Sequence, residues 1–509
     1  MLGASVAASR VLGVLREAVF ASVVGAGAEA DAYRAAFLIP DILNHLLAGG
    51  ALSVAFIPFY ARKLRESGIE GAERVLASVM GTLGLAVTGA TALLWWQAEA
   101  LVAGGYGWGG GYPPEVQERI VYLTRILLPA QVFFVMGGVV RGVLMAHDRF
   151  ASQAAAGVVY NLGIILGGFC AGAEASADGF AWGALVGAFL GPFLTAVLEL
   201  RWSKTARLRA RVAPLDREFL EYLWLAAPLM IGLGMLTVDD WYNKLFGARI
   251  GEGAVALLGY GRQLMLTPVG VIGQSIAIAA LPTLSALWAR RQLEELNALV
   301  LGTLQSGLGL ALLAGAVTFV LADPLVVLVF QRGRFSAEDG AAVAQLLRVF
   351  SFAVPGWVLS QILPRPFYAR EDMWRPMLLG TAVAAAMAPL YWVLGQRFGA
   401  PGLAAAGALG MAMSSGALLG LARLLHGGPD LGAFAGSALR STGIAALVGT
   451  CGWVTPVPDL TGLIGAGVEI VLRGGVMGAV ALVGVHLLGD PATRRAMERI
   501  VRRLGIRRG

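Results

Sequence analysis

Uninterrupted apolar stretches of about 20 residues recur from one end of the chain to the other, and each could cross a hydrocarbon core of about 30 Å. Only 14% of the 509 residues are charged, whereas an ordinary soluble domain has about 25%. Inside a bilayer the backbone polar groups of such a stretch must bond within the stretch, which favours an α-helix. The sequence therefore predicts an all-α polytopic membrane protein.

These stretches predict fourteen transmembrane spans. The spans lie near 3–25, 33–60, 76–96, 119–146, 150–172, 179–200, 219–246, 253–288, 298–322, 340–369, 376–396, 401–422, 432–453 and 464–488. The even-numbered junctions hold about 23 basic residues, and the odd-numbered junctions hold roughly five, including Arg34. Because cytoplasmic loops carry the excess of Lys and Arg, both termini are predicted to face the cytoplasm.

An internal repeat at an offset of 224 residues supports this span count. Residues 51–58 at the end of span 2 resemble residues 275–282 at the end of span 8. Three positions after span 4 match three after span 10 at the same offset: Arg141, Asp148 and Phe150 with Arg365, Asp372 and Trp374. Six spans per copy preserve orientation, so the copies form a parallel repeat, which is typical of transporters with a substrate site between two lobes.

The repeat divides the chain into four predicted parts. Residues 1–215 form an N-lobe of spans 1–6, and residues 216–428 form a C-lobe of spans 7–12. Residues 429–490 add spans 13 and 14, and residues 491–509 form a basic cytoplasmic tail. The first 25 residues lack the basic region and cleavage site of a secretory signal, so we expect them to stay as the first span.

Glycine supplies 70 of the 509 residues, about twice its usual share. Small residues let membrane helices approach closely, so we interpret these glycines as helix-packing positions. Cys170 and Cys451 lie inside apolar stretches, form no CxxC motif and are also interpreted as packing residues.

Several classes of function lack their motifs. The sequence has no GxxxxGK loop for ATP, no GxSxG motif and no histidines at metal-ligand spacing. The net charge of +7 is not gathered into a basic run interleaved with aromatic residues, which argues against nucleic acid as a partner. We therefore expect a transporter without a metal or cofactor, and an enzyme acting within the membrane is the minor alternative.

Charged side chains inside the apolar stretches are candidate functional residues, because such charges are costly and usually face a water-filled cavity. Span 1 carries Arg10, Arg16 and Glu17, and span 8 carries Arg262 beside Gln263. A guanidinium matches the oxygens of a phosphate or pyrophosphate bidentately, so the predicted substrate is an anion. The alternative for the span 1 arginines is that they extend to lipid headgroups.

Acidic residues occur near the start of span 2 and within span 7. Asp31 either contributes to an outer gate or caps the start of span 2. Asp41 follows Pro40, where the proline predicts a kink. In span 7, Asp240 and Lys244 have the spacing of a helical ion pair.

Several segments resemble the signature of the MurJ/MviN family of lipid II flippases. They are Ser9–Glu17, Gly25–Ala32, Phe37–Asp41, Leu47–Pro58, Tyr260–Pro268, Leu281–Pro282, Phe330–Phe335 and Phe367–Arg370. The resemblance implies the MOP exporter fold, with two six-helix lobes and a two-helix groove for a lipid tail. It also implies a flippase that moves undecaprenyl-pyrophosphate-linked peptidoglycan precursor, lipid II, from the inner to the outer leaflet of the bacterial cytoplasmic membrane by alternating access.

The resemblance also suggests site residues. Arg10 and Arg16 match the family's cavity arginines, and Asp31 matches its outer acidic residue. The complete predicted set is Arg10, Arg16, Arg262, Asn44, His45 and Gln263 for substrate binding, with Asp31, Asp41 and Glu17 in the gate.

Three departures from the family pattern matter. Leu43-Asn44-His45 stands in span 2 where the family has Leu-Arg-Arg, and Gly49 stands where the family has an acidic residue. Arg262 is displaced by one residue, about 100° around the helix. The sodium site of some members needs an acid in span 7, where Asn243 stands, and Asn or Asp in span 11, where 377–396 has neither. Sodium coupling is therefore not expected.

The leading hypothesis is a monomeric lipid II flippase whose partners are lipid II and the membrane phospholipids. Two alternatives within transport are a flippase for another polyprenyl-linked glycan and a drug or cation antiporter of the same fold. A non-transporting membrane scaffold of envelope synthesis is the alternative from another class.

Overall fold

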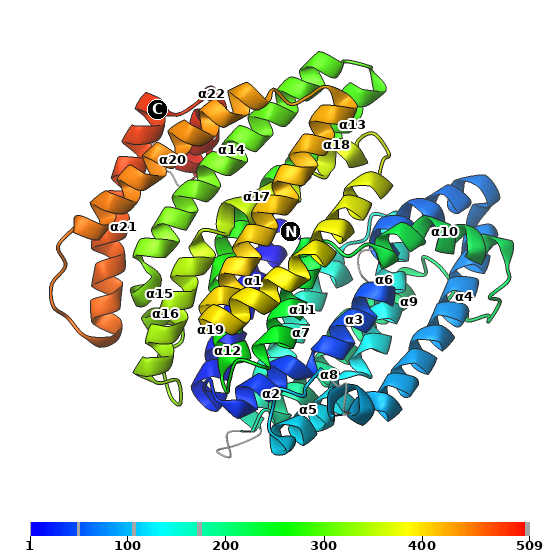
Figure 1. Cartoon of the computed structure of the whole chain (residues 1–509). Helices are drawn as coiled ribbons and strands as arrows, with labels where there is room; N and C mark the ends of the chain where they lie inside the picture. Colours follow the sequence, from blue (N-terminus) through cyan, green and yellow to red (C-terminus); the bar gives the residue numbers. More distant parts are fainter. Residues whose placement is uncertain (1, 48–50, 104–107, 171–175, 504–509) are drawn as a thin grey trace. The chain divides into compact units, whose positions relative to one another are not determined.

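The computed structural model describes residues 2–47, 51–103, 108–170 and 176–503 (Figure 1). All regular elements in this part of the chain are helices, as the sequence predicts. Gly49, one of the departures from the family pattern, lies outside the described residues. The chain divides into two compact units.

Unit 1 consists of Met1–Gly232 together with two short segments, Gly251–Ala256 and Arg332–Phe335. Its helices are α1 (Leu2–Val24), α2 (Ala28–Ala36), α3 (Leu38–Leu47), α4 (Ala51–Ala103), α5 (Pro114–Leu127), α6 (Ala130–Ala146), α7 (Ala151–Cys170), α8 (Asp178–Ala188), the π-helix η2 (Phe189–Leu194), α9 (Thr195–Ser203) and α10 (Arg217–Ile231).

Unit 2 consists of Leu233–Ile250, Leu257–Gln331 and Ser336–Gly509. The remaining helices are α11 (Met235–Gly247), α12 (Ala254–Val269), the π-helix η3 (Gly270–Gln274), α13 (Ser275–Ala289), α14 (Leu293–Val320), α15 (Ala322–Val329), α16 (Ala337–Ser351), α17 (Val354–Ile362), α18 (Arg365–Tyr368), α19 (Trp374–His426), α20 (Leu431–Val454), α21 (Gly462–Leu488) and α22 (Pro491–Arg503).

Two helices of 53 residues, α4 and α19, each contain a break. A straight helix of that length would extend about 80 Å, more than twice the thickness of a hydrocarbon core. Gly68 interrupts α4 with φ 65°, and Gly399 interrupts α19 with φ 63°. Glycine reaches this left-handed conformation without a Cβ penalty, and both glycines lie at predicted junctions between spans.

Predicted span 2 is broken into α2, α3 and the first part of α4. The first break is at Phe37, between Ala36 and Leu38. A proline ring clashes with the carbonyl four residues earlier, and for Pro40 that residue is Ala36, the last of α2. The kink predicted from Pro40 is therefore present, one turn before the proline.

Nine helices in the described part of the chain are long and apolar enough to cross a membrane. The pair Ala337–Ser351 and Val354–Tyr368, bent by 49°, would add a tenth crossing as one broken span. Predicted span 7 is also divided, into α10 and α11. The count of fourteen spans stays a prediction.

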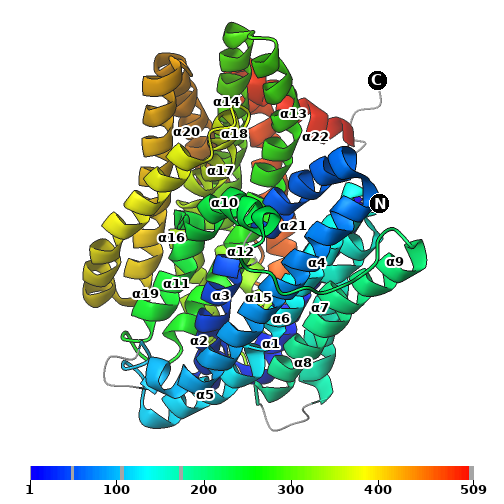
Figure 2. The same cartoon turned by 90° about the vertical axis from the view of Figure 1, so that its right-hand side faces the viewer.

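The glycines of α7 and α8 let these two helices touch, as the sequence analysis expects of helix-packing positions. A Cβ at Gly163 would lie 2.7 Å from the Cα of Gly187, and one at Gly167 would lie 2.2 Å from the carbonyl oxygen of Gly179. Figure 2 shows α7 beside α8 and α4 beside α6, and both pairs are in contact.

Two turns support the internal repeat. The turn after α6 and the turn after α18 share a hydrogen-bond pattern, with a left-handed residue at φ 59° in Asp148 and φ 62° in Glu371. The matching backbone bonds are Asp148 to Met145 and Arg149 to Leu144 in the first turn, and Glu371 to Tyr368 and Asp372 to Phe367 in the second. The counterpart of Asp148 is therefore Glu371, one residue before the predicted Asp372.

Candidate functional site

An ion-pair network in unit 1 joins α1 to α2. Glu17 accepts from both neighbouring arginines: Nη2 of Arg16 lies 2.7 Å from Oε1, and Nη2 of Arg34 lies 2.5 Å from Oε2. All three side chains are largely buried, with exposed fractions of 24% for Arg16, 16% for Arg34 and 11% for Glu17. Two guanidinium groups converge on one carboxylate, and a guanidinium is the side chain that matches the oxygens of a phosphate bidentately.

Packing from α2 and α7 orients these arginines. Nη1 of Arg16 donates to the amide oxygen of Asn161 in α7 at 3.2 Å. The guanidinium of Arg34 lies over the ring of Phe20, 5.8 Å from its centroid, and Phe20 stacks on Tyr33 at 4.6 Å. A guanidinium held at an aromatic face and a carboxylate has little rotational freedom.

Arg34 and Asn161 belong to this network and are not among the residues predicted for the site. The sequence analysis counts Arg34 with an outer junction, and the structure places it in the last turn of α2. Asn161, 7% exposed, was recognisable as a lone amide inside an apolar stretch.

Asp31 is fully buried in unit 1 and caps a helix other than its own. Its Oδ1 accepts from the backbone N–H of Ala256 at 2.7 Å, and its Oδ2 accepts from that of Gly253 at 2.9 Å. These N–H groups lie at the start of α12, where a carboxylate is favoured by the helix dipole. The alternative that Asp31 caps span 2 is wrong, because the N-cap of α2 is Gly27.

A second carboxylate completes a reciprocal arrangement at the same place. Oε1 of Glu252, just before α12, accepts from the backbone N–H of Ala28, the first residue of α2, at 3.1 Å. The two helix starts therefore each receive a carboxylate from the other segment. Burial raises the pKa of Asp31 to about 7, against the lowering effect of its two backbone hydrogen bonds and of Arg34.

A glycine allows the segment Arg332–Phe335 to meet the end of α1. The backbone N–H of Arg334 donates to the carbonyl oxygen of Ser22 at 2.9 Å. Gly333 has φ 60°, and a Cβ there would lie 2.2 Å from the same oxygen. Only glycine permits this approach without displacement of the backbone.

The remaining predicted residues of spans 1 and 2 are placed as follows. Arg10 lies in α1, and Asp41 lies in the first turn of α3. The amide of Asn44 donates to Oε1 of Gln131 at 2.7 Å, and Nε2 of His45 lies 3.0 Å from the carbonyl oxygen of Gly232. Hydrogen bonds of an amide and an imidazole therefore stand at the two positions where the family pattern has arginine.

In unit 2, Arg262 forms ion pairs with two aspartates of α11. Its Nε lies 3.0 Å from Oδ2 of Asp239, and its Nη1 lies 3.0 Å from Oδ1 of Asp240. The guanidinium also lies over the ring of Trp357, 5.1 Å from the centroid. The predicted helical pair of Asp240 and Lys244 is present at 2.7 Å. Arg262 therefore has two carboxylates as partners, whereas Arg16 and Arg34 share one.

Asp239 also connects α11 to α19. It is 1% exposed, and its Oδ1 accepts from the hydroxyl of Tyr391 at 2.5 Å. The acid of span 7 that faces span 11 is therefore Asp239, one turn before Asn243. The amide of Asn243, 4% exposed, has no hydrogen-bond partner within the described part of the chain.

The predicted residues thus divide between the two units. The structure joins Arg16 to Glu17 in unit 1, whereas Arg262 and its neighbour Gln263 lie in unit 2. Among the described residues, no group of three or more His, Cys, Asp or Glu could hold a metal ion.

The family model described as "Lipid II flippase MurJ" matches residues 20–462. This chain belongs to the MurJ family. A probable lipid II flippase MurJ of Rhizobium meliloti is 28% identical over 408 residues, which cover 80% of this chain and 76% of that protein. The lipid II flippase MurJ of Burkholderia cenocepacia is 28% identical over 401 residues, which cover 74% of this chain and 73% of that protein.

Solved structures agree with the predicted MOP-type fold. A lipid II flippase MurJ in an inward closed conformation has a TM-score of 0.78 at 20% identity and covers 95% of this chain and 98% of its own. An inward-facing multidrug resistance MATE family transporter of the MOP superfamily has a TM-score of 0.67 at 16% identity, with 85% and 95% covered. The predictions of a MurJ family member and of a transporter family, rather than an enzyme family, are confirmed. Membership makes this MurJ homologue a multi-pass protein of the bacterial inner membrane.

Proposed function

We propose that this MurJ homologue translocates lipid II from the inner to the outer leaflet of the bacterial inner membrane. The observation that carries the proposal is the network of Arg16, Glu17 and Arg34, because two guanidinium groups converge there on one carboxylate. A pyrophosphate can replace Glu17 as the partner of these arginines, since its oxygens match a guanidinium bidentately.

Six residues form the proposed substrate site. Arg10 and Arg16 bind the pyrophosphate from the N-lobe, and the amide of Asn44 and the ring of His45 supply neutral hydrogen bonds to the headgroup. Arg262 and Gln263 act from the C-lobe. Because Arg262 is paired with Asp239 and Asp240, it reaches the substrate only by giving up one of these partners. We therefore rank Arg16 above Arg262 as the main phosphate ligand.

Asp31, Glu17 and Asp41 form the proposed gate. Asp31 holds the segment Gly251–Ala256 against α2 through two backbone hydrogen bonds. Opening this contact exposes the carboxylate to water, which replaces both donors. Glu17 then restores the arginine pairs once the pyrophosphate has left, and Asp41 lies beside the helix break at Phe37.

The proposal includes the division of the chain into four parts and its orientation in the membrane. Residues 1–215 and 216–428 act as two lobes, 429–490 forms the groove for the polyprenyl tail, and 491–509 is the cytoplasmic tail. Both termini face the cytoplasm, fourteen spans cross the membrane, and the protein works as a monomer without a metal or cofactor.

Native mass spectrometry of the detergent-purified protein tests the substrate class. The expected result is a co-purified polyprenyl pyrophosphate glycan with the mass of lipid II, whose occupancy falls in Arg16→Ala. The matched control is Arg495→Ala in α22, which removes an exposed arginine whose hydrogen bond is to its own helix. A stable protein partner with no bound lipid would contradict the proposal and favour a scaffold.

A flippase for a different polyprenyl-linked glycan is the second candidate. The observation that favours it is the pair Asn44 and His45, whose neutral contacts stand where the family pattern has two arginines. Complementation separates the candidates: a lipid II flippase rescues a strain depleted of its own flippase. A well-expressed protein that fails to rescue it, but carries a different polyprenyl glycan, supports the second candidate.

A further inference from the structure

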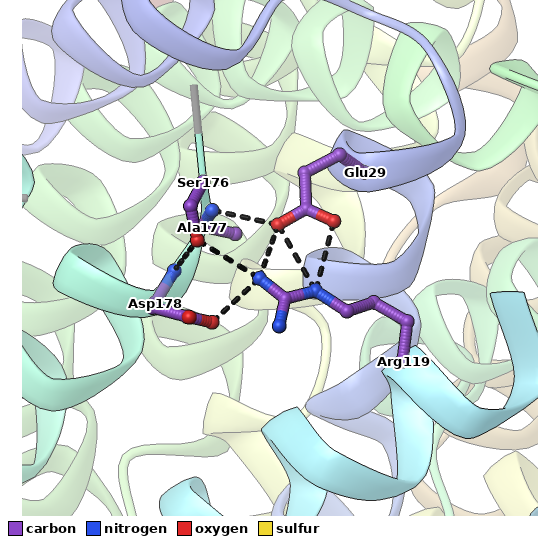
Figure 3. Close-up of polar contacts among 5 residues, drawn as sticks. All are labelled: Glu29, Arg119, Ser176, Ala177 and Asp178. Carbon is purple, nitrogen blue, oxygen red and sulfur yellow. Dashed lines mark hydrogen bonds and ion pairs between the residues drawn. The ribbon is translucent and has the colours of Figure 1, made fainter. Parts of the chain in front are cut away.

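A second polar cluster in unit 1 joins α2 to α5 and α8 (Figure 3). Arg119 in α5 donates bidentately to Glu29, with Nε 2.9 Å from Oε2 and Nη2 2.6 Å from Oε1. The same Nη2 lies 2.5 Å from Oδ1 of Asp178 and 3.0 Å from the hydroxyl of Ser176. Oε1 of Glu29 also accepts from the backbone N–H of Ala177 at 2.7 Å. We call these five residues the Arg119 cluster.

The Arg119 cluster lies at the beginning of the helix that carries the proposed gate. Helix α2 has nine residues, and its N-cap, Gly27, provides no side-chain cap. A helix of this length is marginal by itself, so its place depends on its partners. Each of its charged side chains is directed to a different element: Glu29 to Arg119, Asp31 to the start of α12, and Arg34 to Glu17.

The geometry points to Arg119 as a positioning residue for the gate and the arginine network. Arg119 fixes α2 against α5 and α8, so that Asp31 meets the N–H groups of Gly253 and Ala256 while Arg34 meets Glu17. The inference rests on the proposed function, because it assigns Arg119 a part in the gate of that same transport site. Arg119 itself touches neither the arginine network nor the Asp31 carboxylate.

Bidentate geometry is what makes this arrangement specific. A guanidinium that spans both oxygens of Glu29 fixes the direction of the side chain as well as its distance, which a lysine cannot do. The side chains of Arg119 and Glu29 are 26% and 29% exposed, so water screens the pair only in part. Loss of the pair leaves α2 without its contact to α5 through Glu29, while both contacts of Asp31 and Arg34 remain chemically intact.

Chemical cross-linking measures the position of α2 independently of transport. Cysteines are placed at Ala28 and Glu252, two positions that a hydrogen bond joins, in a background with Cys170 and Cys451 replaced by serine. A short bifunctional thiol reagent reports whether they stay adjacent in membranes. Because Glu252→Cys removes the acceptor of that bond, every yield is compared with the yield of this double-cysteine protein. The variants are Arg119→Ala, Arg119→Lys and the charge swap Arg119→Glu with Glu29→Arg.

Arg125→Ala is the matched control. It changes the same residue type on the same helix, but Arg125 pairs with Glu99 at 3.8 Å and not with α2. The charge swap tests the pair between α2 and α5, because it restores one guanidinium–carboxylate contact there. It does not restore the other contacts, since an arginine at position 29 cannot accept from the N–H of Ala177 and a carboxylate at position 119 lies beside Asp178. It also keeps the inference falsifiable where Arg119→Ala does not fold.

We expect Arg119→Ala to lower the cross-link yield at least threefold and lipid turnover about tenfold, with the KM for lipid II unchanged, because the phosphate ligands stay in place. Arg119→Lys should give an intermediate yield, and the charge swap should raise the yield above that of Arg119→Ala without reaching the wild-type value. An unchanged yield in Arg119→Ala, or an equal fall in the Arg125→Ala control, would overturn the inference. If the wild type cross-links but moves no lipid, the proposed function is contradicted, whereas the inference that Arg119 positions α2 is not.

Discussion

The Oδ1 atom of Asp31 accepts a 2.7 Å hydrogen bond from the backbone N–H of Ala256, 225 residues further along the chain. Glu252 returns the contact by accepting from Ala28. Two helices that the internal repeat predicts as counterparts, at the start of spans 2 and 8, thus cap one another. The amino-terminal ends of both helices are satisfied only while the segments stay together, so separation must transfer their bonded N–H groups and the two carboxylates to water.

The first prediction concerns the pH dependence of this contact. Asp31 has a pKa of about 7 in the closed contact, raised by burial, and near 4 when exposed to water. The closed contact therefore holds a proton more tightly, and its stability falls as the pH rises from about 4 to 7. Between pH 6 and 8 the ratio of closed to open should fall about tenfold. Arg34, Glu252 and Tyr112 are the charged or titratable groups that interact with Asp31.

Double electron–electron resonance between spin labels at Glu115 and Gly251 measures this ratio as a distance between α5 and the segment that Asp31 holds. Both residues are exposed in unit 1. The fraction of molecules with the shorter distance between the two labels should decrease from pH 6 to pH 8 in the wild type and stay constant in Asp31→Asn. A pH response that survives in Asp31→Asn would assign the titration to another group.

The second prediction concerns Glu17→Gln. Glu17 competes with a pyrophosphate for Arg16 and Arg34, so its neutral replacement should strengthen binding of the anion and slow its release. We expect a KM for lipid II at least threefold lower and a turnover rate at least fivefold lower in reconstituted vesicles. Weaker binding in Glu17→Gln would mean that Glu17 orients the arginines and does not compete for them.

The third prediction concerns the stability of unit 2. Asp239 is 1% exposed and accepts from both Arg262 and Tyr391. Removal of one member of a buried ion pair typically costs about 3–5 kcal/mol, because the other charge stays buried without its partner. Asp239→Ala should lower the thermal midpoint of the detergent-solubilised protein, whereas Asp459→Ala, in an exposed segment, should not. Equal midpoints would show that Arg262 finds another partner.

The fourth prediction concerns Gly333. Gly333 has φ 60°, and a Cβ there would clash with the carbonyl oxygen of Ser22. Gly333→Ala must therefore displace the segment Arg332–Phe335 from α1. The left-handed backbone alone costs about 1–2 kcal/mol for a residue with a Cβ. Thiol labelling of Ser22→Cys should become at least threefold faster in Gly333→Ala. Gly420→Ala is the control, since a Cβ there meets nothing within 4 Å.

The sequence was sufficient for the membrane class and the family, because apolar length and short sequence motifs are local features. It also predicted the pair of Asp240 and Lys244, whose spacing within one helix determines contact. It could not provide the partners of Asp31, because local rules for capping consider only neighbouring residues. Asp31 caps a helix, but one that begins more than 200 residues later.

Arg34 illustrates a different limit. A count of basic residues by loop treats each one as a topological signal and does not consider which side chain it pairs with. Its contact with Glu17 depends on how α2 returns along α1, which follows from tertiary packing. The pairing of Arg262 with Asp239 depends on tertiary packing in the same way.

Translocation of lipid II by the purified protein in vesicles tests the central claim most directly. The wild type and Arg495→Ala should both move lipid II between leaflets. Loss of a charge-assisted hydrogen bond to phosphate costs about 1.5–3 kcal/mol, so Arg16→Ala should be about tenfold to a hundredfold slower. Its insertion and thermal midpoint should match those of Arg495→Ala. An Arg16→Ala variant that moves lipid II at the wild-type rate would contradict the assignment of the pyrophosphate to this arginine network.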